Sequence, residues 1–175
     1  MTRNRKRGPW TATLATLLVF LTAAVEATDT EGAIDQLAAQ VGQVMPDGRG
    51  VRVVVTDFTD GKGVTSDYGR RVAHLLILRL GFNPRLMPVE WNVLGLVLSE
   101  LNLKRSDLAK LENARRLAKQ FGADVVVVGS LTDLGAQVAL DTRVLDIASG
   151  ETLGFASAAV TKDAKVTRML ETGRE

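Results

Sequence analysis

VRVVVTDFTDGKGVTSDYGRR, residues 51–71, joins a β-branched apolar run to the start of a helix. The successive valines at 53–55 are typical of a strand that is buried on both faces. Ser66 is a helix-capping residue, and apolar residues then recur at helical spacing until Gly81. The stretch therefore predicts a central strand over 51–58 followed by a helix, which is the first half of a parallel crossover unit.

The rest of the chain extends this unit into a mixed sheet. Pro84 and Pro88 limit residues 85–89 to an edge strand. Residues 123–129 repeat the apolar pattern of a central strand, whereas the residues after a turn at 132–135 alternate with period two. The remaining predicted elements are helices over 34–45, 90–101 and 106–122, and antiparallel strands over 137–146 and 152–161. The predicted fold class is α/β, a three-layer or two-layer sandwich whose mixed sheet has about five strands, with a parallel first half and an antiparallel C-terminal meander.

The first residues have the three-part form of a secretory signal. Four basic residues precede an apolar core, and Val25 and Ala27 place small residues before a cleavage site. We expect cleavage after Ala27; the alternative is an uncleaved anchor, although the apolar run is shorter than the roughly 20 residues of a membrane span. The expected organisation is a signal peptide over 1–27, an N-terminal helix and linker over 28–50, an α/β domain over 51–165 and a C-terminal tail over 166–175.

Charge and cysteine content exclude several classes of partner. Without residues 1–27, Lys and Arg fall from 22 to 18 and Asp and Glu from 20 to 19, so the net charge moves from +2 to −1. The basic character of the whole chain therefore belongs to the targeting segment, and nucleic acid is not an expected partner. The chain has no cysteine, which excludes disulfides, thiolate metal sites and a direct lipid anchor on an N-terminal cysteine.

The loop over 57–67 follows a central strand at its carboxyl end, where open α/β sheets place ligands. Its glycines match neither a phosphate-binding loop nor a dinucleotide fingerprint, and its aspartates would repel phosphate. Their spacing also differs from that of a calcium loop. We expect a structural turn, with no cofactor, no metal and no catalytic residue. The alternative is an interaction or ligand site made by Asp57, Thr59, Asp60, Lys62, Ser66 and Trp91.

Other side chains that could carry chemistry are few. His74 is the only histidine and has no nucleophile or second ligand near it in the sequence, so we expect a structural role and no enzyme. The pairs Arg70–Arg71 and Arg115–Arg116 each indicate a solvated helix face, with a binding patch as the alternative. For Trp91 we expect core packing first and an interface anchor second.

An ordered set of short motifs covers about residues 51–161. They are Asp57-Phe58 at the end of the first strand, Ser66 and Gly69, Leu98-Ser99-Glu100-Leu101, Ala118-Lys119 before Gly122-Ala123-Asp124, Gly129, and Leu145-Asp146 before Ser149-Gly150-Glu151. In this order they resemble the FlgO-like domain of bacterial envelope proteins, which is related to the CsgG-like curli-assembly and LpoB-like proteins.

The resemblance implies a non-enzymatic protein in the periplasm or peripheral to the outer membrane. It would act through protein contacts in surface-structure assembly, and FlgO-like members are associated with flagella and motility. The expected partners are envelope or flagellar proteins, and a homo-oligomer. The resemblance adds no catalytic residues. Two alternatives stay open: a periplasmic ligand-binding or sensing domain that uses the loop over 57–67, and, with less support, a hydrolase that uses the carboxylates of this loop.

Overall fold

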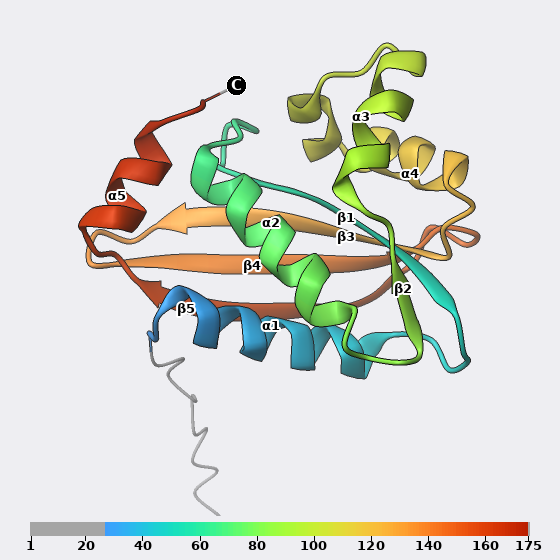
Figure 1. Ribbon diagram of the computed structural model, residues 1–175, viewed down its shortest axis with the longest axis horizontal. Coiled ribbons are helices and arrows are strands. Elements are labelled where there is room, and N and C mark those ends of the chain that lie inside the picture. Colours follow the sequence, from blue (N-terminus) through green and yellow to red (C-terminus); the bar gives the residue numbers. More distant parts are fainter. Residues whose placement is uncertain (1–26, 175) are drawn as a thin grey trace, which may run out of the picture.

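The computed structural model describes residues 27–174, without the side chains of residues 91–94. The predicted signal peptide therefore lies, except for Ala27, outside the described residues. A five-stranded sheet of order β2-β1-β3-β4-β5 runs through the domain (Figure 1). Its strands are β1 Val51–Thr59, β2 Leu86–Pro88, β3 Val125–Asp133, β4 Gln137–Asp146 and β5 Thr152–Thr161. β1 pairs in parallel with β2 and β3, whereas β3, β4 and β5 pair antiparallel, which confirms the predicted mixed sheet.

Helices cover the two faces of the sheet unequally (Figure 1). The helices are α1 Thr30–Val44, α2 Asp67–Leu80, α3 Trp91–Glu100, the 3₁₀ helix η1 Arg105–Ala109, α4 Leu111–Gln120 and α5 Ala164–Glu171. α1, α2 and α5 share one core with buried side chains from β1, β3, β4 and β5, and we call this side the closed face. α3, η1 and α4 share a second core with β1, β3 and one end of β4, and we call this side the open face. The sandwich thus has three layers at its parallel end and two at its antiparallel end.

The two apolar runs of the sequence lie side by side in the middle of the sheet. Val53, Val54 and Val55 pair with residues 125–127, and the register then shifts before Phe58. A bulge of this kind re-aims the side chains that follow it. Phe58 therefore joins the core of the closed face together with Val53 and Val55, although strict alternation would turn it to the other side.

Two glycines of the motif set make room for Phe58. A Cβ on Gly129 would overlap the Phe58 ring, and a Cβ on Gly69 would overlap its carbonyl oxygen. Phe58 itself is fully buried. The glycines therefore let strand β3 and helix α2 approach β1 closely, which gives a packing reason for the spacing of these motifs.

Helix α1 closes the free edge of the sheet. The Gln40 side chain donates to the Ser157 carbonyl (2.9 Å) and accepts from the Ser157 N–H (3.1 Å). Thr28 extends this protection, since its N–H donates to the Ala159 carbonyl (3.1 Å) and its carbonyl accepts from the Thr161 N–H (2.8 Å). The outer side of β5 is therefore partly paired, as edge strands commonly are to prevent open-ended pairing. In the part of the chain that the structure describes, no helix is both long enough and apolar enough to cross a membrane.

Three local features differ from, or go beyond, the sequence prediction. Ser106 does not begin the helix that ends near residue 120, because the Asp107 carboxylate accepts from the Lys104 N–H (2.9 Å) and closes the separate turn η1. α4 begins only at Leu111. β3 includes the first two residues of the predicted turn at 132–135 and ends at Asp133, because its last residues pair with β4. Helix α5 spans the expected start of the C-terminal tail and is capped by Asp163, whose side chain accepts from Val166 N–H.

Candidate functional site

Asp60 organises the loop after β1. Its Oδ1 accepts from the N–H groups of Lys62 and Val64, both at 2.9 Å, and its Oδ2 accepts from Arg174 at 2.7 Å. Burial alone would raise the pKa of Asp60, but these two backbone donors and the charge of Arg174 outweigh it and lower that pKa. The carboxylate therefore holds the turn in shape and ties it to the C-terminal segment.

The other predicted site residues divide between two places. Ser66 caps α2 by accepting from the Gly69 N–H (3.2 Å), and Thr59 is buried and bridges to Thr65. With Asp60, Ser66 lines a cavity of about 130 Å³. Asp57 instead turns toward η1, where it is 2% exposed and forms an ion pair with Arg105 at 3.6 Å.

The six residues are therefore not gathered into one site. Lys62 is exposed, and the side chain of Trp91 lies outside the described part of the structure. Within residues 27–174, no cluster of three or more His, Asp or Glu side chains is placed to hold a metal ion. The use of the loop as an interaction or ligand site stays a prediction.

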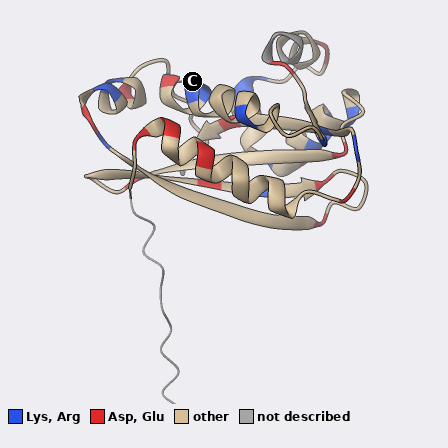
Figure 2. Cartoon of the chain, turned by 60° about the horizontal axis from the view of Figure 1, so that its bottom comes forward, with Lys and Arg blue, Asp and Glu red and all other residues tan. Residues whose placement is uncertain are grey.

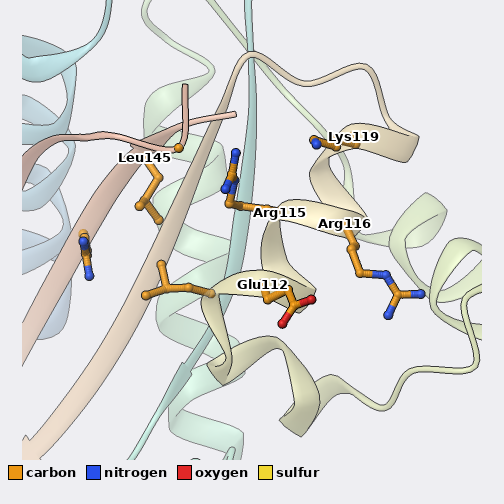
Figure 3. Close-up of a pocket in the computed structure, with 8 residues that line it drawn as sticks. Glu112, Arg115, Arg116, Lys119 and Leu145 are labelled. Carbon is orange, nitrogen blue, oxygen red and sulfur yellow. The ribbon is translucent and has the colours of Figure 1, made fainter. Parts of the chain in front are cut away.

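A second cavity, of about 400 Å³, lies between α4 and the β4–β5 turn on the open face (Figure 3). We call it the basic pocket, because four of its lining residues are basic and one is acidic. It is lined by Leu111, Glu112, Arg115, Arg116, Lys119, Arg143, Leu145 and Gly150. The pair Arg115–Arg116 was visible in the sequence as a candidate patch. The contribution of Arg143 was not, because it depends on how β4 pairs and where α4 lies above it.

Arg115 is held in place from several sides. Its guanidinium donates to the Ile147 carbonyl (3.1 Å) and lies against Gly150, where an added Cβ would come within 2.7 Å of it. Figure 3 shows Arg115 rising beside Leu145, whereas the neighbouring Arg116 points the other way. The Nε of Arg115 is buried and has no hydrogen-bond partner among the described residues.

Arg143 of β4 lines the pocket and contacts the neighbouring strand β5. Its Nε donates to the Thr152 hydroxyl (2.8 Å), and its guanidinium lies 6.0 Å from the centroid of the Phe155 ring. Phe155 is 68% exposed. An arginine next to an exposed aromatic ring is a combination that recurs in protein interfaces.

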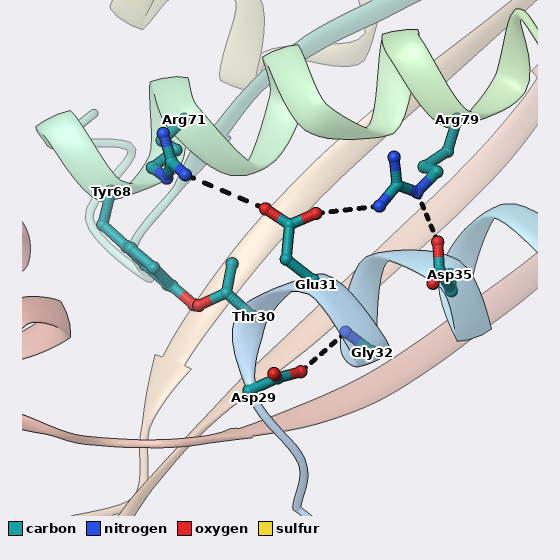
Figure 4. Close-up of polar contacts among 8 residues, drawn as sticks. All are labelled: Asp29, Thr30, Glu31, Gly32, Asp35, Tyr68, Arg71 and Arg79. Carbon is teal, nitrogen blue, oxygen red and sulfur yellow. Dashed lines mark hydrogen bonds and ion pairs between the residues drawn. The ribbon is translucent and has the colours of Figure 1, made fainter.

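The closed face has a different polar chemistry, in which the charged groups bind one another (Figure 4). Glu31 of α1 contacts Arg79 (2.9 Å) and Arg71 (3.8 Å) of α2, and Arg79 also pairs with Asp35. The hydrogen bond from Arg79 to Asp35 raises the pKa of the guanidinium. These pairs join α1 to α2 on the closed face.

The hydroxyls of Thr30 and Tyr68 share a hydrogen bond of 3.2 Å at the same boundary (Figure 4). Burial raises the pKa of Tyr68, since the ionised phenolate would lose more hydration than the neutral ring does. This contact joins the start of α1 to the start of α2.

The fold is similar to that of solved structures of LpoB. The C-terminal domain of LpoB from Salmonella enterica superposes with a TM-score of 0.66 and 21% identity, over 77% of this chain and 100% of that chain. The NMR structure of LpoB from Escherichia coli gives a TM-score of 0.64 and 18% identity, over 93% of this chain and 82% of that chain. The shared fold agrees with the LpoB-like architecture expected from the motifs. No curated protein matches the chain in sequence.

The family itself is shown by the sequence match. Residues 40–167 fit the family described as curli production assembly/transport component CsgG. The match begins within α1, ends within α5 and includes the whole sheet. The relation to CsgG-like proteins expected from the motifs is therefore confirmed, and the chain belongs to the CsgG family.

Proposed function

We propose that this chain is an exported, non-catalytic envelope protein that acts as an accessory or scaffold in the assembly of an outer-membrane surface structure. The observation that carries the proposal is the match of residues 40–167 to a family of assembly and transport components. It acts through protein contacts, with envelope proteins and with further copies of itself as partners.

The more specific proposal is a FlgO-like role in flagellum-type assembly or stability. Its support is the order of the motifs, from Asp57-Phe58 to Ser149-Gly150-Glu151. The packing of Phe58 against Gly69 and Gly129 explains why part of this set occurs together. That packing concerns the fold, so the link to flagella needs a test in cells.

Export by a cleaved signal is part of the same proposal. Cleavage after Ala27 would make Thr28 the first residue of the mature protein. The nitrogen of Thr28 lies 3.1 Å from the Ala159 carbonyl, and a terminal amine at this place still donates a hydrogen bond. The mature chain would thus comprise the segment 28–50, the domain 51–165 and the C-terminal residues 166–175.

The test is a deletion strain complemented with the intact gene or with a version that starts at Thr28 behind a new methionine. We expect the intact chain to fractionate with the periplasm or outer membrane, to begin at Thr28 by N-terminal sequencing, and to restore motility and flagellar number. The shortened chain should stay in the cytoplasm and restore neither.

The experiment tests export and the flagellar role separately. An uncut cytoplasmic protein would overturn export and with it the envelope role. An exported protein whose deletion leaves flagella and motility intact would overturn the flagellar role alone. Crosslinking of intact cells, followed by mass spectrometry of the crosslinked species, then tests for envelope partners and for homo-oligomers.

A further inference from the structure

The basic pocket concentrates positive charge in a domain that otherwise has little net charge. Without residues 1–27 the chain carries 18 basic and 19 acidic residues, yet four basic residues and only one acidic residue line this cavity. α1 on the closed face carries acidic side chains and no basic ones (Figure 2). Such an uneven distribution attracts groups of opposite charge to one place on the surface.

The pocket is amphipathic as well as basic. Leu111 and Leu145 supply apolar side chains to the lining, beside the guanidinium of Arg115.

The pocket is also continuous with the uncovered part of the open face. Arg143 lines the pocket and lies over the exposed ring of Phe155 on the neighbouring strand. Further along the strand pair β4–β5, Asp141 lies opposite Ser157 on the same side, and the Ser157 hydroxyl donates a hydrogen bond of 2.6 Å to the Asp141 carboxylate. A ligand longer than the pocket could therefore continue across β4 and β5.

We propose that the basic pocket and the adjoining face at Phe155 bind an acidic peptide segment of a protein partner, in which carboxylates stand next to apolar side chains. Carboxylates pair with Arg115, Arg116, Lys119 and Arg143, and the apolar side chains pack on Leu111 and Phe155. Glu112 in the lining and Asp141 beyond it disfavour a dense polyanion, which cannot avoid them. This inference rests on the proposed function, because it names the surface through which the protein contacts would form.

The test measures binding of a short fluorescent peptide, in which glutamates alternate with leucines and glycines, to the intact protein purified from its host. Fluorescence anisotropy is followed at low and at high salt, with a peptide in which lysine replaces every glutamate as the control. We expect the acidic peptide to bind, its affinity to fall with salt, and the lysine peptide not to bind.

Two matched double variants locate the site. R116E/K119E reverses two exposed charges at the pocket, and K165E/R168E reverses two exposed charges with the same spacing on α5 of the closed face. The first should weaken binding by about tenfold or more, and the second by less than about twofold. The single variant R143Q, which does not disturb α4, should also weaken binding.

Three results would overturn the proposal. Equal losses in the two double variants would mean that overall charge, and no particular site, attracts the peptide. Binding of phosphatidylglycerol vesicles or dextran sulfate without binding of the peptide would assign the pocket to lipid or to a sulfated glycan. If the protein binds none of these probes, the basic pocket is not a site for anionic ligands. Each of these results is independent of export and motility, so the proposed function would still stand or fall on its own test.

Discussion

The two faces of the sheet share the same strands but differ in how far helices cover them and in how their charged groups are paired. The closed face is covered along its length by α1, α2 and α5, and its charged groups pair within the domain, as Glu31 does with Arg79. The open face is covered only at the parallel end, and Arg116, Lys119 and Arg143 of the basic pocket are exposed. The difference indicates that the closed face maintains the fold, whereas the open face is available for contacts with other molecules.

The bulge in β1 links the two faces. It sends Phe58 into the core of the closed face and Asp57 toward Arg105 on the open face. One irregularity in a central strand thus serves both layers. Without this shift in register, simple alternation after Val55 would put Asp57 on the closed face and Phe58 on the open face.

The largest difference between the two faces is expected in the free energy of unfolding when one buried leucine in each layer is truncated. Leu76 lies in the core of the closed face and Leu117 in that of the open face, and both are fully buried. We expect Leu76→Ala to lower the free energy of unfolding by about 3–5 kcal/mol and Leu117→Ala by about 2–3 kcal/mol, because the partly uncovered layer can relax around the cavity. Urea denaturation measures both, and a larger loss for Leu117→Ala would contradict the comparison.

Filling the space next to Phe58 should have the next largest effect. Gly129→Ala puts a methyl group against a buried ring that cannot move away, and we expect a loss of about 1–3 kcal/mol. Gly61→Ala is the matched control, because a Cβ there meets nothing within 4 Å. If both variants unfold at the same urea concentration as the parent, the packing reason for the motif is wrong.

The hydrogen bond between Thr30 and Tyr68 offers a smaller test of the contact between α1 and α2. Tyr68→Phe should lower stability by about 1 kcal/mol, since it removes one partly buried hydrogen bond. The raised pKa of Tyr68 adds a pH dependence. Above about pH 10 the unfolded chain loses the phenol proton while the folded one keeps it, so stability should fall as the pH rises further.

The Phe variant should lack this alkaline loss of stability. Tyr68 is the only tyrosine of the chain, so the absorbance change on phenolate formation reports this residue alone. A phenol that titrates as in a free peptide would show that the hydroxyl is not buried in this contact.

The smallest effect is expected at the turn next to the basic pocket. The N–H and hydroxyl of Ser149 donate to Asp146 and, together with the charge of Arg115, lower the pKa of its carboxyl group. A lowered folded-state pKa gives stability that is present above about pH 4 and is lost as the pH falls through the folded value. Asp146→Asn should therefore show a weaker acid dependence of the urea midpoint than the parent. An unchanged acid dependence would mean that the turn does not need the charge.

Local signals in the sequence were sufficient for most of the elements. The valines at 53–55 and 125–128, the cap at Ser66 and the alternation in 137–146 all depend on neighbours along the chain, and each marks a strand or helix that the structure contains. Where a signal was ambiguous, the prediction was wrong: the acidic group of Asp107 could cap a helix or a short turn, and the structure uses it for η1.

The motif order in the sequence also indicated the relation to CsgG-like proteins, which the family match over residues 40–167 confirms. What only the tertiary structure decided is which face of the sheet is covered and which side chains meet there. Arg143 and Arg115 are far apart in the sequence and come to one pocket because β4 pairs with β3 and α4 packs above that pair. Asp57 and Asp60, singled out together in the sequence, did not gather in the same way, since Asp57 pairs with Arg105 of η1 whereas Asp60 binds the backbone of its own loop and Arg174. Periodicity reports the burial of one element at a time, whereas a site depends on the relative placement of several, which is set by long-range packing.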